Sequence, residues 1–328
     1  MTQSAFINQL HHALKHQSSV HTSDEREVLQ SLWSGYGEIA RYRDEISGKS
    51  VIVKSVAPSH AASHPRGWGT SLSHQRKLSS YHNEQQFYAK YAAMTNAQCR
   101  VPHCYVSGSQ GDRSWLILED LDASGFAERC LSPNQKAIDA GLDWLANFHA
   151  CFLNVSTPEL WPQGNYWHLN TRPDEWDAMP EGPLKDSAVG IDRLLSECQF
   201  KTLLHGDAKV ANFCFDANWN QLAAVDFQYV GQGCGIQDVV YFLGSCLSGQ
   251  ALELQAEALY ECYFTTLQNA SKARISQADW SLLESQWRAL IPFAWADFER
   301  FLIGWSPGHK KLSGYSARQT QMALKQLV

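Results

Sequence analysis

Apolar and polar residues in the first 120 positions alternate mainly with the period of a β-strand. The apolar runs are short and are separated by turn residues such as Gly, Ser and Asp. Such runs predict strands, whereas apolar residues spaced three and four positions apart predict helices. The predicted strands are residues 28–33, 38–42, 51–56 and 115–121, with a further short strand and turn within 102–111. The predicted helices of this region are residues 5–15 and 80–91.

Helical spacing dominates the rest of the chain. It predicts helices at residues 132–153, directly after Asp238, and at 251–268 and 279–303. Ser132 followed by Pro is a good helix start, as a cap and a first-turn residue. His149 falls on or beside the apolar face of this helix, where a hydrogen-bonded core histidine is a more ordinary interpretation than a catalyst.

Residues 203–227, LLHGDAKVANFCFDANWNQLAAVDF, concentrate the polar chemistry of the chain. His205, Asp207 and Asn212 have the spacing H-x-D-x-x-x-x-N of a kinase catalytic loop. Strands predicted at 212–215 and 222–225, around a turn at 216–220, would return Asp226 to the side of Asn212. An isolated match of this spacing would more often be ordinary turn and cap residues. The hairpin and the second Asp favour a phosphoryl-transfer site.

The predicted roles follow from the chemistry of these groups. A carboxylate and an amide oxygen side by side, from Asp226 and Asn212, are hard ligands suited to Mg²⁺ held between phosphates. Asp207 could accept the proton of an attacking hydroxyl. Lys209 could reach a transferred phosphoryl oxygen as a point charge.

Lys54 interrupts an apolar strand and is costly if it points inward without a partner. It could be the outward residue of an alternating strand. Glu84 offers the other interpretation, because it shares the apolar face of the predicted helix 80–91 with Phe87 and Tyr88. A strand Lys paired with a helix Glu is how kinases fix the Lys that binds nucleotide phosphates.

Two weaker signals accompany this pair. Gly35 and Gly37 lie in a turn between strands, which could lay backbone N–H groups over a phosphate or could be an ordinary hairpin turn. The backbone around Glu119 and Leu121, at the end of the last predicted strand of this region, could hydrogen-bond an adenine edge.

Composition narrows the classes of function. The chain has 328 residues and a formal net charge of -6, so it has no broad basic field for nucleic acid. It contains no apolar stretch long enough for a membrane span, and its amphipathic N-terminus lacks the apolar core of a signal peptide. Its nine scattered cysteines suit a reduced, cytoplasmic protein. No obligate protein partner is evident.

The segments HGDAKVAN and VDFQ, together with Lys54 and Glu84, resemble the aminoglycoside phosphotransferase and choline kinase superfamily. VDFQ followed closely by Asp238, and the long Ser/His-rich loop before NEQQFY, resemble most the ecdysteroid kinase-like branch. The resemblance implies an α+β, protein-kinase-like fold of two lobes. The smaller, antiparallel-sheet lobe is expected at residues 1–120 and the larger, mainly helical lobe at 121–328.

The resemblance also implies a reaction and its cofactors, ATP and Mg²⁺. Asp207 matches the catalytic base, and His205 and Asp238 match positions that brace its loop. The metal ligands would be Asn212 and Asp226, and the phosphate-positioning pair would be Lys54 and Glu84. Gly206, in place of the Arg of regulated protein kinases, argues against a protein kinase. The chain is thus expected to phosphorylate a hydroxyl of a small molecule.

Several alternatives remain open at this stage. A catalytically silent nucleotide-binding scaffold would keep the same residues, and a metal-dependent phosphohydrolase would leave Lys54 and Glu84 unexplained. The acceptor could be a choline- or aminoglycoside-type amine or a lipophilic alcohol. Residues 57–79 could be a surface loop or a lid, and the aromatic residues 160–176 could be a packed loop or part of an acceptor pocket.

Overall fold

The structure is a computed structural model that describes residues 3–17, 26–32, 35–44, 47–58 and 71–327. The chain forms two compact units. Unit 1 comprises residues Met1–Ala93 and Val101–Glu128, and unit 2 comprises Met94–Arg100 and Arg129–Val328. Residues 121–128 thus group with the first unit, whereas the sequence divided the chain between residues 120 and 121.

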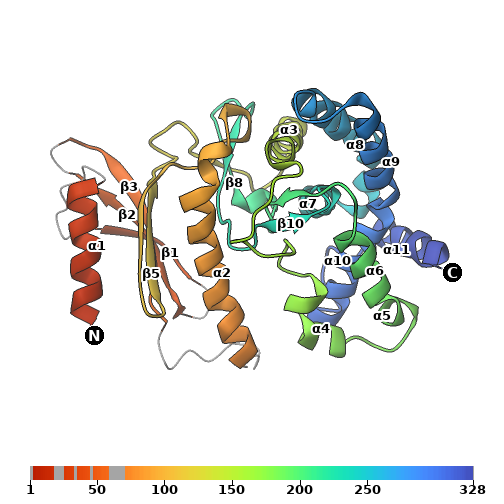
Figure 1. Cartoon of the computed structure of the whole chain (residues 1–328), viewed down its shortest axis with the longest axis horizontal. Helices are drawn as coiled ribbons and strands as arrows, with labels where there is room; N and C mark the ends of the chain where they lie inside the picture. Colours follow the sequence, from red (N-terminus) through yellow and green to blue (C-terminus); the bar gives the residue numbers. More distant parts are fainter. Residues whose placement is uncertain (1–2, 18–25, 33–34, 45–46, 59–70, 328) are drawn as a thin grey trace. The chain divides into compact units, whose positions relative to one another are not determined.

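Unit 1 is a five-stranded antiparallel sheet with one helix on each face (Figure 1). The strand order is β1-β2-β3-β5-β4. The strands are β1 (Arg26–Ser31), β2 (Gly37–Arg43), β3 (Ser50–Val56), β4 (Cys104–Gln110) and β5 (Arg113–Glu119), and the helices are α1 (Gln3–Gln17) and α2 (Ser71–Lys90). These strands confirm the alternating pattern of the sequence. Residue 33 of the first predicted strand lies outside the described residues.

Alternation along β3 sends its side chains to two separate clusters. Val51 and Val53 pack with Leu10 and Leu14 of α1, which confirms that the first helix covers this sheet. Val56 points to the other face, where it packs with Tyr81 of α2. Because strand side chains alternate, Lys54 shares the α2 face with Val56.

The second helix is longer than the sequence indicates. α2 begins at Ser71, whereas apolar spacing predicts a start at residue 80. Its first turns are rich in Ser, Gln, Arg and Lys, so they carry no apolar stripe for periodicity to detect. The part of the 57–79 segment from residue 71 onward is therefore helical, and residues 59–70, on which the lid interpretation depends, lie outside the described residues.

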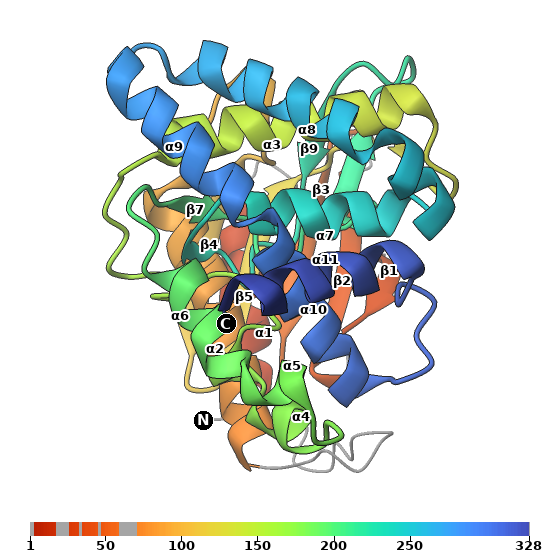
Figure 2. The ribbon, with the colours of Figure 1, turned by 90° about the vertical axis from the view of Figure 1, so that its right-hand side faces the viewer.

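Unit 2 is mainly helical and contains two small antiparallel strand pairs, β7–β10 and β8–β9. Its α3 and α8 lie side by side (Figure 2). The strands are β7 (Thr202–Leu204), β8 (Phe213–Phe215), β9 (Leu222–Ala224) and β10 (Gly231–Gly233), and β6 (Glu128–Arg129) lies at the boundary of the units. The helices are α3 (Gln135–Phe152), α4 (Pro173–Asp177), α5 (Pro183–Asp186), α6 (Ala188–Ser196), α7 (Ile236–Cys246), α8 (Gly249–Ser271), α9 (Gln277–Ala289), α10 (Ile291–Trp305) and α11 (Gly314–Leu327). Short 3-10 turns of unit 2 are η3 (Ala97–Cys99), η4 (Leu169–Thr171) and η5 (Val210–Asn212), and η2 (Ala92–Met94) spans the boundary of the units.

Two helix boundaries differ from the sequence-based prediction. The cap of α3 is Asn134, whose side chain accepts the Ala137 N–H, so the assignment of Ser132 as cap was wrong. The predicted helix 279–303 is two helices, α9 and α10, which meet at Leu290. Pro292 explains the break, because proline fits the first turn of a helix and not its interior.

α3 and α7 are largely buried helices of unit 2. The inward face of α3 is buried as its spacing predicts, with Ile138, Leu142, Leu145, Phe148 and Phe152 at most 2% exposed. Among the described residues, no helix is long and apolar enough to span a bilayer.

Candidate functional site

A sharp backbone turn follows β7 in unit 2 and starts the segment that carries Asp207. Gly206 makes this turn with φ +80°, in the left-handed region that glycine tolerates. A Cβ at this position would lie 2.0 Å from the carbonyl oxygen of Tyr229. A side chain such as the Arg of regulated protein kinases therefore has no room here.

Asp238, in the first turn of α7, holds this turn in place. Its carboxylate accepts the backbone N–H of His205 at 2.6 Å and that of Gly206 at 3.1 Å. His149 contacts the same carboxylate, with its Nε2 3.2 Å from Asp238 Oδ2. The other ring nitrogen of His149, Nδ1, is 2.7 Å from the Tyr263 hydroxyl. His149 is fully buried, so the interpretation as a hydrogen-bonded core histidine is confirmed.

His205 links the same turn to the end of β9. Its Nδ1 accepts the Asp207 N–H at 3.2 Å, and its Nε2 donates to the carbonyl oxygen of Val225 at 3.0 Å. Burial lowers the pKa of His205, although the nearby carboxylates of Asp238 and Asp207 oppose that shift. The neutral imidazole with hydrogen on Nε2 satisfies both bonds. The loop and the strand that precedes Asp226 are thereby tied together.

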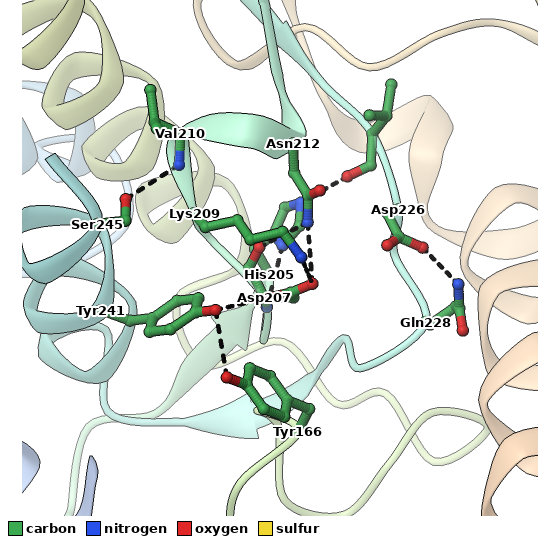
Figure 3. A network of polar contacts seen from close by, with 11 residues as sticks. Tyr166, His205, Asp207, Lys209, Val210, Asn212, Asp226, Gln228, Tyr241 and Ser245 are labelled. Carbon is green, nitrogen blue, oxygen red and sulfur yellow. Dashed lines mark hydrogen bonds and ion pairs between the residues drawn. The ribbon is translucent and has the colours of Figure 1, made fainter. Parts of the chain in front are cut away.

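Asp207 is 8% exposed and accepts hydrogen bonds from three side chains (Figure 3). Lys209 Nζ lies 2.8 Å and Asn212 Nδ2 lies 3.1 Å from its Oδ2. The Tyr241 hydroxyl donates to its Oδ1 at 3.0 Å. These bonds fix the orientation of the carboxylate from both sides.

Asn212 and Asp226 are neighbours across the β8–β9 hairpin, as the sequence predicts. The Val225 N–H donates to the Asn212 carbonyl oxygen at 3.0 Å, and Phe213 pairs with Ala224. The amide nitrogen of Asn212 is engaged by Asp207, both at its carboxylate and at its carbonyl oxygen, 2.8 Å away. Its amide oxygen is therefore the atom left to act as a ligand.

Asp226 has an uncommon backbone conformation for a residue with a side chain. Its φ is +71°, in the left-handed region, which costs free energy for any L-residue. The amide of Gln228 donates to its carboxylate at 2.5 Å. Strained backbone of this kind persists only where the surrounding structure holds it in place, and it is found most often at functional positions.

The two predicted ligands, the Asp226 carboxylate and the Asn212 amide oxygen, suit Mg²⁺ better than a cation that takes all of its ligands from the protein. Among the residues that the structure describes, no group of three or more His, Cys, Asp or Glu side chains is arranged to hold a metal ion. One carboxylate and one amide oxygen are few ligands. Mg²⁺ is the cation that is commonly bound in this way, because it completes its coordination with water and phosphate oxygens.

Lys209 binds Asp207 in this structure. Burial by itself would lower the pKa of Lys209, but the Asp207 carboxylate outweighs burial and the net pKa is raised. The Lys209 side chain therefore stays protonated beside the Asp207 carboxylate. Its predicted contact with a phosphoryl group stays a prediction.

Tyr241 and Ser245 contribute to this cluster and were missed from the sequence, which considered Tyr166 only as a member of the aromatic segment 160–176. Tyr241 orients Asp207, Tyr166 lies 3.3 Å from the Tyr241 hydroxyl, and Ser245 Oγ accepts the Val210 N–H at 3.0 Å. Burial raises the pKa of both tyrosines, which keeps their hydroxyls protonated. Tyr241 had a usable signal, since it lies one helical turn after Asp238 on the same face.

The aromatic segment 160–176 is mainly packed. Trp167 is 1% exposed, and the Trp161 indole donates to the carbonyl oxygen of Gln228 at 2.8 Å. Tyr166 is its contribution to the Asp207 cluster, through Tyr241. The packed-loop interpretation is confirmed for most of the segment, and a part in an acceptor pocket stays a prediction.

In unit 1, Lys54 and Glu84 form a buried ion pair. Lys54 Nζ lies 2.6 Å from Glu84 Oε2, and the two residues are 5% and 1% exposed. The pair joins β3 to α2, so Lys54 is not the solvent-facing residue of an alternating strand. The cation also lies 5.7 Å from the centre of the Tyr81 ring.

The two weaker predicted nucleotide contacts lie at the glycine turn before β2 and at the end of β5. Gly37, at φ +143°, is required because a Cβ there would lie 2.0 Å from the carbonyl oxygen of Ser55, while Gly35 has φ +72° and open space around it. The Glu119 N–H donates to His103, and the Leu121 carbonyl accepts the Phe126 N–H at 2.8 Å. The predicted contacts of adenine with the backbone of Glu119 and Leu121 stay predictions.

Comparison with solved structures defines the class of this fold. A structure titled as a microcompartment-associated aminopropanol kinase matches 97% of this chain and 93% of its own, with a TM-score of 0.52 and 15% identity. A Plasmodium vivax ethanolamine kinase matches 100% of this chain and 91% of its own, with a TM-score of 0.54 and 10% identity. The chain thus has the α+β, protein-kinase-like fold of two lobes found in small-molecule kinases.

The family itself is identified from sequence. The ecdysteroid kinase-like family matches residues 42–162 and 190–274, more than half of the chain. The protein belongs to this family, as the sequence motifs indicated. No curated protein matches the chain.

Proposed function

We propose that the protein transfers the γ-phosphoryl group of ATP to a hydroxyl of a small acceptor. One observation carries the proposal: Asp207 holds the Asn212 amide nitrogen, and the hairpin bond from Val225 to Asn212 sets Asp226 at the adjoining strand end. The Asn212 amide oxygen and the Asp226 carboxylate would then share one cation. Membership of a kinase-like family and the buried Lys54–Glu84 pair support it independently.

Each predicted residue then has a separate task. Mg²⁺, when bound, neutralises phosphate charge, and Asn212 and Asp226 would hold it. Lys54, fixed by Glu84, would bind the nucleotide phosphates, while Glu119 and Leu121 would bind adenine through their backbone.

The acceptor hydroxyl would be oriented by Asp207. Its carboxylate would accept the hydroxyl hydrogen bond and then the proton, while Tyr241 keeps the carboxylate from rotating. Lys209 is close enough to Asp207 to offset negative charge that develops beside it.

Substitution of Asp207 by Ala or Asn tests this assignment. We expect acceptor-dependent ATP consumption to fall by about 10²–10⁴-fold, the usual contribution of a general base. Binding of Mg²⁺–ADP, measured by calorimetry, should stay within a few-fold of wild type. Equal loss of binding and turnover would contradict the role of Asp207 as the base.

The same assays separate the rival functions. A silent scaffold would bind nucleotide without turnover in any acceptor mixture, and a phosphohydrolase would consume ATP at a rate independent of acceptor. The two solved structures are titled as kinases of amino alcohols, whereas the family is named for ecdysteroids. Amines and lipophilic alcohols therefore both belong in the acceptor screen.

A further inference from the structure

Lys311 is a partly buried cation close to the Asp207 cluster. It lies in the link between α10 and α11, and its Nζ is 4.4 Å from the centre of the Tyr241 ring and 5.5 Å from that of Phe298. Tyr241 is the residue that donates to Asp207. The ammonium group of Lys311 thus lies on an aromatic ring that touches the predicted base.

No carboxylate of the described residues neutralises this ammonium group at ion-pair distance. Its contacts are the two aromatic rings. The Asp207 carboxylate is engaged by Lys209 at 2.8 Å. Burial lowers the pKa of Lys311 to about 8, which Asp207 opposes and Lys209 reinforces. Lys311 is therefore mostly protonated at neutral pH, and its ammonium group can form an ion pair with an anion.

A second cation covers the neighbouring rings. The guanidinium group of Arg172 lies 5.4 Å from the centre of the Tyr166 ring and 5.5 Å from that of Phe301. Glu175 pairs with Arg172 at 3.2 Å. The rings of Tyr166, Phe301, Tyr241 and Phe298 thus each already have a cationic side chain of the protein over one face, in the place that a quaternary amine would take.

We infer that the acceptor carries an anionic group, which Lys311 binds, and that it is not an amine. This inference rests on the proposed kinase function and specifies the substrate class of the same site. An ammonium group on the acceptor would meet Lys311 and Lys209 beside Asp207, and the like charges would repel it. An anionic group would pair with Lys311 while the acceptor hydroxyl reaches Asp207.

Two matched sets of hydroxylated probes test the inference, one small and one lipophilic. The small set is 3-hydroxypropanoate, the neutral 3,3-dimethylbutan-1-ol and the cationic choline. The lipophilic set is cholate, its neutral methyl ester and a cationic amide of the same steroid. We expect the anionic member of at least one set to have a kcat/KM about tenfold or more above its neutral counterpart, as one added charged contact gives. The cationic member should be the poorest.

Variants of Lys311 assign the preference to this side chain. Lys311→Met and Lys311→Gln should lose the advantage of the anionic probe, and Lys311→Arg should keep it. Lys310→Met is the matched control, because Lys310 is the exposed neighbour, and it should behave like wild type. Calorimetric binding of the same probes to Asp207→Asn supplies a readout that does not depend on phosphoryl transfer.

Three outcomes would overturn the inference: a cationic probe that is the best acceptor, an anionic preference that survives in Lys311→Met, or no anionic preference in either set. A protein that neither binds Mg²⁺–ATP nor consumes it with any probe would instead contradict the proposed kinase function. The two failures are therefore distinguishable.

Discussion

Asp226 combines a proposed metal-ligand role with an uncommon backbone conformation. At φ +71°, Gly is free of strain, Asn and Asp are tolerated, and other residues pay about 1–2 kcal/mol. The native Asp is thus one of the few residues other than Gly that this backbone conformation accommodates. Substitutions here separate the stability of the fold from the chemistry of the site.

We expect Asp226→Gly to unfold at or above the wild-type temperature and Asp226→Ala to be about 1 kcal/mol less stable than the Gly variant. Asp226→Asn should stay near wild type. All three should lose turnover, since each removes the carboxylate. Calorimetric unfolding and ATP consumption measure the two effects.

Asp216→Gly is the matched control for this series. Asp216 accepts the backbone N–H groups of Asn220 and Gln221, each at 2.8 Å, in the turn of the same hairpin. Its loss should lower stability and leave activity intact, the reverse of Asp226→Gly. If Asp226→Gly were less stable than Asp226→Ala, the strain argument would be wrong.

His205 predicts how stability depends on pH. Its pKa in the folded state lies below the unfolded value of about 6.5, because burial disfavours the charged imidazolium. Between these two pKa values the unfolded chain binds a proton that the native state does not, so the free energy of unfolding falls as the pH decreases. Urea unfolding from about pH 7 to pH 5.5 should show this loss in wild type.

His205→Gln should flatten that slope, whereas His82→Gln, at an exposed position on α2, should retain it. Parallel slopes for wild type and His205→Gln would show that another group controls acid stability.

At the scale of elements, the Lys54–Glu84 pair joins β3 to α2. Removal of one partner from a buried pair leaves an uncompensated charge and costs about 3–5 kcal/mol. We expect Lys54→Met to be destabilised by this order, and Lys54→Met/Glu84→Leu to recover much of the loss. Both variants should lose nucleotide binding, because neither has the cation.

The exposed ion pair Arg193–Glu197, at the C-terminal end of α6, is the control for the Lys54 and Glu84 variants. Its side chains are 75% and 66% exposed, so Glu197→Gln should cost less than about 1 kcal/mol. A double variant of Lys54 and Glu84 with the summed cost of its single variants would indicate that the two side chains do not interact.

The sequence predicted the elements that carry a clear apolar signal. β2 and the apolar half of α2 differ in burial between their two sides, whereas β3 and β5 were recognised as short apolar runs, which are buried on both faces of the sheet. The first turns of α2 lack that contrast, and the cap of α3 depends on which of several polar residues reaches an amide. The direction of Lys54 was open because alternation assigns a residue to a face without indicating what covers that face.

At the scale of the whole molecule, nucleotide binding should appear as added stability. A ligand that binds only the native state raises the unfolding free energy by about 2.7 kcal/mol at a hundredfold excess over its Kd. We expect Mg²⁺–ADP to raise the melting temperature by a few degrees, and EDTA to remove most of that increase. Asp226→Asn should show little Mg²⁺-dependent increase, and Asp216→Asn the wild-type increase. An increase that is the same with EDTA would contradict a metal held by Asn212 and Asp226.

The sequence located the predicted base and its hairpin because those residues fall within one short segment. The surroundings of Asp207 were not predictable in the same way. Tyr166, Tyr241, Phe298 and Lys311 come from distant parts of the chain and meet only through the packing of unit 2. Under the proposed function such residues would recognise the acceptor, so motif spacing predicts a phosphoryl-transfer chemistry more readily than its substrate.

The left-handed backbone at Asp226 also has an evolutionary consequence. A change to Gly or Asn at this codon removes the carboxylate and relieves or preserves the local conformation, so natural selection for folding alone would not oppose it. Relatives that have lost catalysis are therefore expected to carry Gly or Asn here in an otherwise intact fold. Asp is expected to be retained at this position where the proposed reaction is itself under selection.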